Sequence, residues 1–287
     1  MDKKPLSPKN DFVFHKIFSE NMSALRGFLQ AVLDLPAEEY QRLEVVNPNL
    51  EREYPEDKLG ILDLKIYTSS QKIIDVEIQI RRQPSIWKRL LFYSAKLLVE
   101  QIKKGSQYQR INRVITIYIA DHVLIEESES YFHRFRLYDE NTKISFPDSI
   151  EINTLEIPKA TEPDGTPLGD WMSFFRAGEK EEFMAAAQSN PAIAEAWGVI
   201  KVLSGDERAR ALAEAREKAR MDFEDNYNGA YKEGEQKGRL EGEQKGRLEG
   251  IQEVALNALR ENMPVETVAR LTGLPLAEVK QIAARLD

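Results

Sequence analysis

The sequence predicts an α/β protein built around a mixed sheet, and two observations carry that prediction. Short runs rich in Ile, Leu and Val follow a first amphipathic segment and are separated by polar turns. A longer amphipathic segment then precedes another apolar run, and a strand, a helix and a strand in that order favour a right-handed crossover onto one sheet. The expected elements are helical segments at 11–33 and 85–104 and strands at 43–46, 60–67, 73–80 and 113–120.

The residues around these runs justify their bounds. Apolar side chains recur at helical spacing from Phe12 to Val32, in one helix or two short ones, and Pro36 ends the segment. The polar stretch 68–72 joins two strands into a hairpin, and Gly105 is a typical stop for the long helix. The remaining expected elements are strands at 131–138 and 150–157, a short helix at 171–176 and helical segments from 179 to about 220.

Carboxylates interrupt the apolar runs of the predicted hairpin. Side chains alternate between the two faces of a strand, so Asp75, Glu77 and Gln79 share one face, and Asp63 lies opposite its apolar neighbours. A buried carboxylate without a partner is costly, and Mg²⁺, which prefers oxygen ligands, would satisfy it. A solvated strand face explains the same alternation equally well.

Four short motifs follow one another along the first part of the chain. They are Ser7-Pro-Lys-Asn-Asp11-Phe-Val-Phe-His-Lys-Ile-Phe, Val46-Asn-Pro-Asn49, Ile61-Leu-Asp-Leu-Lys65 and Val76-Glu-Ile-Gln79. Over about residues 5–175 the chain resembles the Rpn family of recombination-promoting nucleases, also described as transposases, in the PD-(D/E)xK nuclease superfamily. The resemblance implies a restriction-endonuclease-like αβββαβ core, in which helices flank a mixed sheet, and an α-helical C-terminal region.

The same resemblance implies a metal-dependent DNA endonuclease that hydrolyses phosphodiester bonds and is linked to DNA recombination or mobile elements. Its catalytic residues would be Asp63, Glu77 and Gln79. Mg²⁺, with Mn²⁺ as the other candidate, would be held by Asp63, Glu77 and the backbone carbonyl of Ile78. Gln79 stands where the superfamily usually has lysine, and a neutral amide neither carries a positive charge nor titrates. The alternative is therefore a catalytically weak or silent DNA-binding or assembly protein on the same scaffold.

Three further positions match the family pattern around this core. Asp11 corresponds to an N-terminal acidic position, and its alternative role is to cap the first helix. Arg89 and Tyr93 lie one helical turn apart and match an Arg-x-x-x-Tyr motif that would support the site. For Tyr93, a place in the hydrophobic core is the better-fitting explanation.

The charge pattern bears on nucleic-acid binding. The formal net charge of −8 argues against general affinity for nucleic acid. From Arg81 to Arg113, however, the chain has nine basic residues and one acidic residue. We expect a double-stranded DNA partner, bound by Arg81, Arg82, Lys88 and Lys96, although such a run is ordinarily a solvated helix face. Cleavage of RNA would use the same chemistry, and nothing in the predicted strands distinguishes an RNA substrate from a DNA substrate.

The amino-acid composition restricts the kind of metal site and the cellular compartment that we expect for this protein. The chain has no cysteine, which excludes disulfides and thiolate zinc sites, and its three histidines are not spaced as in HExxH motifs. No stretch approaches the roughly 18 consecutive apolar residues of a membrane span. The polar N-terminus lacks the pattern of a signal peptide. We therefore expect an oxygen-ligated metal and a cytoplasmic protein without membrane association.

The C-terminal part contains a direct repeat with regularly spaced glycines. Glu233–Leu240 recurs as Glu241–Leu248, and glycine occupies every fourth position from 234 to 250. Opposite charges four residues apart support a helix by about 0.2–0.5 kcal/mol each, whereas each glycine costs about 1 kcal/mol relative to alanine. A close-packed helix pair, most simply in a homodimer, and a fraying linker explain the repeat equally well.

The last segment resembles a helix-turn-helix with Gly273 at the turn. It is either a small packing module or a DNA contact made through Lys280 and Arg285. The domains expected from the whole sequence are a nuclease-like catalytic domain at 1–176, a helical region at 177–228, the charged glycine repeat at 229–250 and the helix-turn-helix-like module at 251–287.

Overall fold

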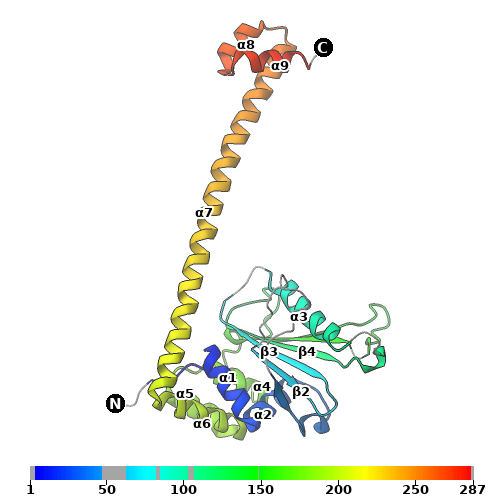
Figure 1. The fold of residues 1–287 in the computed structure, drawn as a ribbon, viewed down its shortest axis with the longest axis vertical. Coiled ribbons are helices and arrows are strands. Elements are labelled where there is room, and N and C mark those ends of the chain that lie inside the picture. The colour runs from blue at the N-terminus through cyan, green and yellow to red at the C-terminus, as the bar shows by residue number, and fades with distance from the viewer. Residues whose placement is uncertain (1–3, 47–62, 82–84, 103–106, 148, 286–287) are drawn as a thin grey trace. The chain divides into compact units, whose positions relative to one another are not determined.

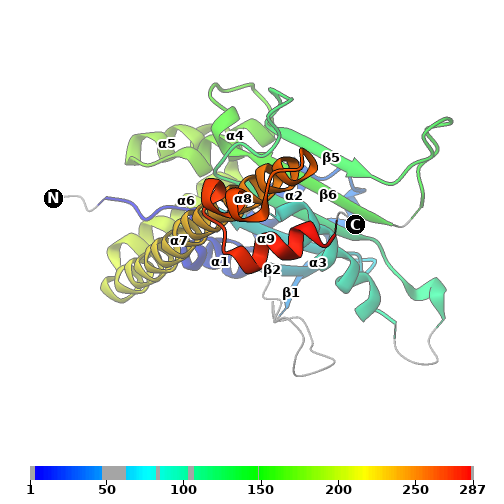
Figure 2. The ribbon, with the colours of Figure 1, turned by 90° about the horizontal axis from the view of Figure 1, so that it is seen from above.

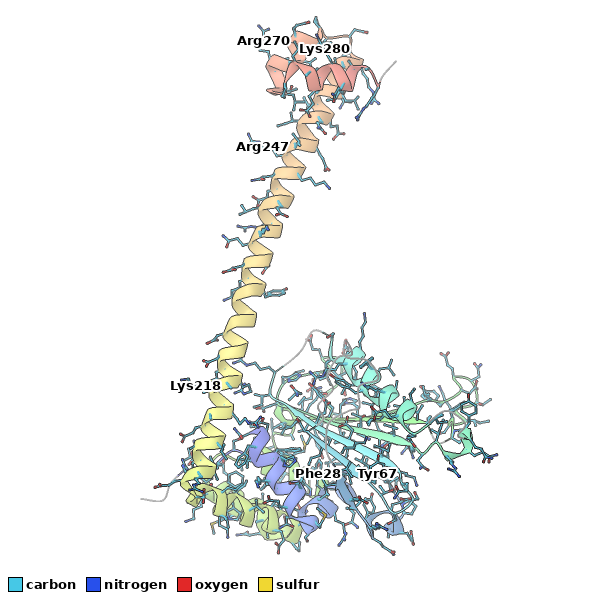
Figure 3. All side chains as sticks on the ribbon, in the orientation of Figure 1. Phe28, Tyr67, Lys218, Arg247, Arg270 and Lys280 are labelled. Carbon is cyan, nitrogen blue, oxygen red and sulfur yellow. The ribbon has the colours of Figure 1, made fainter. Side chains whose placement is uncertain are left out.

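The computed structural model describes residues 4–46, 63–81, 85–102, 107–147 and 149–285. The chain divides into two compact units. Unit 1 ends at Lys218, which is labelled in Figure 3, and unit 2 begins at Ala219. Each unit is described by itself.

Unit 1 is built on a mixed sheet (Figure 1), which has six strands in the described part of the chain. The strand order is β1-β2-β3-β4-β6-β5. The parallel strands β3, β4 and β6 form the centre, and antiparallel neighbours flank them on both sides. Figure 2 shows β5 beside β6 at one edge. The strands are β1 (Glu44–Val46), β2 (Leu64–Tyr67), β3 (Ile73–Gln79), β4 (Val114–Ala120), β5 (Phe132–Arg136) and β6 (Ile150–Glu156).

The helices of unit 1 begin and end at recognisable caps. The expected segment 11–33 is two helices, because the Asn21 side chain accepts hydrogen bonds from the first backbone N–H groups of the second one. The helices are α1 (Asp11–Glu20), α2 (Met22–Val32), α3 (Ile86–Glu100), α4 (Pro167–Arg176), α5 (Lys180–Ser189) and α6 (Pro191–Gly205). The described part of unit 1 also contains the short 3₁₀ helices η1 (Ala37–Tyr40), η2 (Tyr108–Arg110) and η3 (Ile157–Lys159). The predicted α/β fold with a PD-(D/E)xK-like element order is confirmed.

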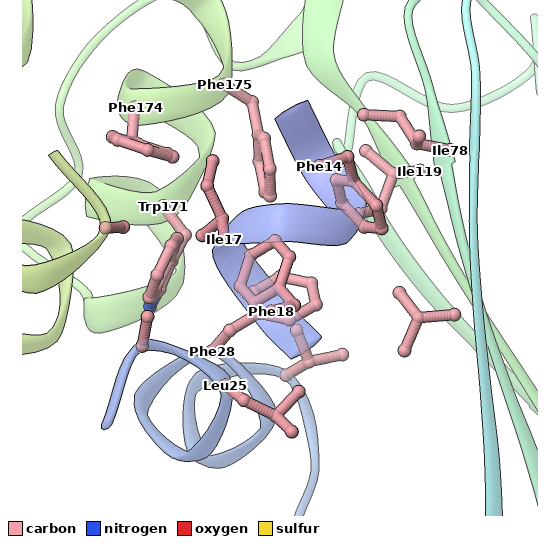
Figure 4. Close-up of a cluster of buried hydrophobic side chains, with 14 of the residues drawn as sticks. Phe14, Ile17, Phe18, Leu25, Phe28, Ile78, Ile119, Trp171, Phe174 and Phe175 are labelled. Carbon is pink, nitrogen blue, oxygen red and sulfur yellow. The ribbon is translucent and has the colours of Figure 1, made fainter. Parts of the chain in front are cut away.

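Helices cover both faces of the sheet (Figure 1). On one face, α1, α2 and α4 bury a group of large aromatic side chains against the strands (Figure 4), among them Phe18, Phe28 and Trp171. On the other face, α3 lies over β3 and β4 with Leu90 and Leu97 buried. The central strands are therefore covered on both sides, which places every side chain of β4 in the interior.

Residues 177–218 share the core of unit 1. Phe183 of α5 and Ile193 and Trp197 of α6 belong to the same buried cluster as the aromatic residues of α1 and α4. Ala213, near the start of α7 (Glu207–Arg260), also belongs to it. The expected domain limit at residue 176 therefore falls inside unit 1, and the compact unit extends to Lys218.

Unit 2 consists of the remainder of α7 together with α8 (Val265–Thr272) and α9 (Leu276–Ala283). The glycine repeat lies within α7, and apart from the adjacent residues and backbone of the same helix, no described atom comes within 4 Å of a Cβ built on any glycine from 234 to 250. Gly273 ends α8 with a positive φ of 74°, as expected for the turn. The three helix segments share a small core around Ala255, Val268 and Val279, while Lys280 (Figure 3) and Arg285 are exposed.

Among the described residues, no helix combines the length and the apolar character needed to cross a lipid bilayer.

Candidate active site

Asp63 lies immediately before β2 and reaches across to β3. Its Oδ2 accepts a hydrogen bond of 2.7 Å from the backbone N–H of Ile78. The carboxylate therefore sits beside the stretch of β3 that contains Glu77. Burial raises the pKa of Asp63 to about 6, against the opposing effect of the Ile78 hydrogen bond.

Asp75 and Glu77 lie on the face of β3 that α3 covers. The neighbouring Ile78 points into the aromatic core on the opposite face (Figure 4), as the two-residue period of a strand requires. Asp75 and Glu77 are each only 1% exposed. The shared face predicted from the sequence is present, but the solvated strand face that the alternation also allowed is wrong, because α3 excludes water from it.

Neither carboxylate oxygen of Glu77 accepts a hydrogen bond from a described residue, and the same holds for Asp75. Burial raises the pKa of Glu77 to about 7, against the opposing charge of Arg89, and Asp63 adds to the rise. Burial also raises the pKa of Asp75 well above its ordinary value, and the charge of Glu77 adds to this effect. The face under α3 thus holds desolvated carboxyl groups that a cation would stabilise.

Arg89 of α3 is a cationic neighbour of Glu77, and Tyr93 of the same helix lies beside Arg89. The Arg89 Nη2 atom lies 4.0 Å from Glu77 Oε2. The Arg89 guanidinium is also 5.3 Å from the centre of the Tyr93 ring, within the range of a cation–π contact. Tyr93 itself is partly buried and packs against the small cluster around Leu97. It therefore contacts both the core and the arginine beside the site.

Asp11 is the first residue of α1, and the structure assigns the cap to its neighbour. The Asn10 side chain accepts from the Phe12 and Val13 backbone N–H groups, so the alternative role of Asp11 as N-cap is wrong. The charge of Asp11 contributes to the raised pKa of Asp63, which places the two carboxylates within electrostatic reach. Asp11 Oδ2 also lies 3.4 Å from Arg216 Nη1.

Comparison with known protein families identifies the family to which these residues belong. Residues 8–230 match the model of a family described as PD-(D/E)XK nuclease family transposase. The chain belongs to this family. No curated protein and no solved structure gives a match. Membership confirms the resemblance to the superfamily that the four sequence motifs predicted. PD-(D/E)XK nucleases generally use divalent metals.

The acidic residues of this nuclease-family chain fit a divalent cation in their chemistry. Asp63 and Glu77 supply hard oxygen donors, and both Glu77 oxygens lack hydrogen-bond donors among the described residues. The described residues contain no group of three or more His, Cys, Asp or Glu side chains arranged as a metal cluster. A site with two carboxylates suits Mg²⁺, which usually keeps several waters and binds one or two carboxylates plus substrate phosphate.

Gln79 and Ile78 occupy the end of β3, at the carboxyl edge of the parallel strands. The Gln79 backbone carbonyl accepts a 2.9 Å hydrogen bond from the Asp121 backbone N–H, which fixes the strand end against the segment after β4. The Gln79 side chain is partly buried. The roles predicted for its amide and for the Ile78 carbonyl stay predictions.

The basic run after β3 divides into residues with different surroundings. Arg81 and Lys88 are exposed, Lys96 is partly buried, and Arg82 lies outside the described residues. At the end of the run, Arg113 forms an ion pair with the buried Glu151 of β6. Part of the positive charge counted in the sequence thus belongs to the interior of the sheet rather than to a phosphate-binding surface.

The structure also brings to this candidate site two residues, Asp75 and Tyr118, that are not among the catalytic and metal-binding residues predicted from the sequence. Asp75 was visible as a carboxylate two residues before Glu77, but its complete burial depends on α3. Tyr118 occupies the position on β4 that pairs with Glu77 on β3. Its sequence context, Val114-Ile-Thr-Ile-Tyr-Ile-Ala120, is typical of a buried strand and carries no signal that one hydroxyl lies beside a carboxylate.

Proposed function

We propose that the chain is a metal-dependent DNA endonuclease that hydrolyses phosphodiester bonds, with a link to recombination or mobile elements that rests on its family. The observation that carries the proposal is Glu77, a buried carboxylate without hydrogen-bond donors among the described residues, beside the partly buried Asp63. Such a pair destabilises the fold unless a cation or protons neutralise it.

Each residue of the site would have its own role in this reaction. Asp63 and Glu77, with the Ile78 backbone carbonyl, would hold Mg²⁺ or Mn²⁺. The bound ion would polarise the scissile phosphate and lower the pKa of the attacking water. Gln79 would orient that water through its amide and would leave the proton to solvent, because an amide does not titrate. Asp11 would add negative charge on the Asp63 side of the site.

The α3 side would support this chemistry. Arg89, 4.0 Å from Glu77, would favour the ionised form of the Glu77 carboxylate against the effect of burial, and Tyr93 would hold the guanidinium through its ring. Arg81, Arg82, Lys88 and Lys96 would contact the phosphates of double-stranded DNA, which position the substrate without reading its sequence. A cytoplasmic site of action and a homodimer formed through the C-terminal helical region remain part of the proposal.

Cleavage of supercoiled plasmid tests the function. Purified protein is incubated at low salt with Mg²⁺, Mn²⁺ or Ca²⁺, beside Asp63→Ala and beside Asp222→Ala as a matched control on the exposed surface of α7. We expect nicking or linearisation that requires Mg²⁺ or Mn²⁺, disappears in Asp63→Ala and persists in Asp222→Ala. Cleavage that Asp63→Ala retains would contradict the proposed site.

The second candidate is a catalytically silent DNA-binding or assembly protein, and Gln79 is the residue that favours it. A folded wild-type protein that binds DNA without metal dependence and leaves plasmid intact would support this alternative. Gln79→Lys then restores the charge that the superfamily usually has at this position. Cleavage by that variant alone would show that the scaffold is competent and that Gln79 silences it. Substituting RNA for plasmid distinguishes the two nucleic acids.

A further inference from the structure

Tyr118 lies in a row of polar side chains that crosses the sheet beneath α3. In the parallel pairing of β3 and β4, Tyr118 is the register partner of Glu77. In the parallel pairing of β4 and β6, it is also the partner of Thr154. Register partners on neighbouring strands share one face of the sheet, with backbones about 4.8 Å apart. The phenol ring therefore lies between a carboxylate and a hydroxyl.

The Tyr118 hydroxyl is buried, and no described residue forms a hydrogen bond with it. The side chain is fully buried and packs with Ile86 and Leu90 of α3. Its oxygen has no hydrogen-bond partner among the described residues, and neither do the two Glu77 oxygens. A buried polar group without a hydrogen bond destabilises the fold, so it is unusual for a donor and an acceptor on neighbouring strands both to lack one.

The protonation states of the two groups make them complementary. A tyrosine phenol ordinarily has a pKa of about 10, so the Tyr118 hydroxyl carries its proton at neutral pH and can donate. A carboxylate that binds a cation is ionised and can accept with the oxygen that the cation leaves free. A hydrogen bond to a charged acceptor is about twice as strong as one to a neutral hydroxyl, which favours Glu77 over Thr154 as the partner.

We propose that Tyr118 is a positioning residue for the metal site, whose hydroxyl donates a hydrogen bond to the Glu77 carboxylate when that carboxylate binds the divalent cation. The inference rests on the proposed function. The hydroxyl orients Glu77 and fixes which of its oxygens faces the ion. Outer partners of metal ligands typically contribute 10–100-fold to metal affinity.

Tyr118→Phe tests the inference with two measurements that do not depend on cleavage. The first is the Mn²⁺ affinity of the full chain by calorimetry, and the second is the stability of the metal-free protein in urea. We expect Mn²⁺ to bind about tenfold more weakly. We expect the metal-free stability to stay unchanged or to rise, because the substitution removes a hydroxyl to which no residue in the described ranges is hydrogen-bonded. If the Tyr118 hydroxyl instead formed a purely structural hydrogen bond, Tyr118→Phe would lower the metal-free stability and leave the Mn²⁺ affinity unchanged.

Two matched variants serve as controls. Thr154→Val removes the neighbouring unpaired hydroxyl on the other side of the ring and should leave Mn²⁺ affinity unchanged. Tyr40→Phe removes a buried hydroxyl that donates to the Leu33 carbonyl at 2.9 Å, so it should lower stability without changing the affinity.

The outcomes separate the inference from the proposed function. Equal Mn²⁺ affinity in wild type and Tyr118→Phe overturns the inference and leaves the metal site standing. A loss of metal-free stability in Tyr118→Phe like that of Tyr40→Phe also overturns it, because the hydroxyl then has a structural partner. Absence of Mn²⁺ binding by the wild type overturns both.

Discussion

The β2–β3 hairpin has a buried carboxylate near each end, and the two have opposite surroundings. At the turn, Glu39 of η1 accepts hydrogen bonds from Thr68, Ser70 and Lys72. Burial opposes its ionisation, but these hydrogen bonds outweigh that effect and lower the pKa of Glu39 to about 2. At the other end, burial raises the pKa of Glu77 to about 7, and no described residue donates a hydrogen bond to it.

The difference shows what donors do for a carboxylate in the interior of a protein. Glu39 and Glu77 are the same residue type and both are buried, so burial alone cannot decide the sign of the pKa shift. Donors from the turn make the Glu39 charge favourable for folding, whereas the Glu77 charge opposes folding. One hairpin thus contacts, at its turn, a carboxylate whose charge stabilises the fold and carries, near its other end, a carboxylate that has to be neutralised.

The largest effect is expected from Glu39→Ala. The substitution removes the acceptor shared by Thr68, Ser70 and Lys72, and breaking such a buried, charged network costs about 3 kcal/mol. Urea unfolding at pH 7 measures the loss. The same substitution at the adjacent, exposed Glu38 is the control and should change stability by less than about 0.5 kcal/mol.

The pH dependence of this loss has a defined sign. The folded pKa of Glu39, about 2, lies below its ordinary value of 4.5, so its contribution is fully present above about pH 4.5. The contribution is lost as the pH falls through 2. The stability difference between wild type and Glu39→Ala should therefore shrink from pH 5 to pH 2. A difference that stays constant over this range would show that packing, rather than charge, accounts for it.

Glu77→Gln should act in the opposite direction in metal-free protein. The folded pKa of Glu77, about 7, lies above its ordinary value of 4.5. Between these values the folded state holds the proton more tightly, so wild-type stability falls as the pH rises through this window. Glu77→Gln has no charge to bury, so its free energy of unfolding should exceed that of the wild type by about 2 kcal/mol at pH 8 and by little at pH 5.

Urea unfolding in EDTA at both pH values measures this gain. Adding Mn²⁺ at pH 8 should reverse the order, because the cation stabilises only the protein that binds it, by about 2.7 kcal/mol at 100 times the dissociation constant. A loss of stability for Glu77→Gln in EDTA at pH 8 would mean that Glu77 has donors that neutralise its burial. Glu77 would then resemble Glu39, and the contrast between the two ends of the hairpin would be wrong.

The sequence was sufficient for the geometry of the Glu77 end. Two apolar runs joined by a polar turn predict a hairpin, and the two-residue period predicts the strand face of each carboxylate. The resemblance to the nuclease family is what pairs Asp63 with Glu77. The structure shows Asp63 bonded to the Ile78 backbone, next to Glu77. The order of strands and helices could be predicted for the same reason, because each element carries its own period.

The Glu39 end could not be predicted, because its partners are distant in sequence. Glu38 and Glu39 are adjacent and chemically identical, yet only Glu39 is buried, against a turn about thirty residues away. The burial of Glu77 was equally hidden, since alternation of polar and apolar residues is typical of a half-exposed strand. It depends on α3, whose Ser94 bonds Thr116 on the same face of the sheet.

The smallest effect is expected from Ser70→Ala, which weakens the Glu39 end without removing it. The Ser70 hydroxyl donates to Glu39 at 2.7 Å, and the Ser70 backbone N–H, which the substitution keeps, also donates at 3.2 Å. We expect a loss of about 1 kcal/mol in urea and a Glu39 pKa that moves up toward 4.5, measured by NMR titration. Ser69→Ala is the matched control, because the Ser69 hydroxyl bonds the Glu39 backbone carbonyl and not its carboxylate. It should reduce stability by a similar amount and leave the Glu39 pKa unchanged. An equal pKa change in both variants would show that the position of the turn, rather than donation to the carboxylate, sets the charge state of Glu39.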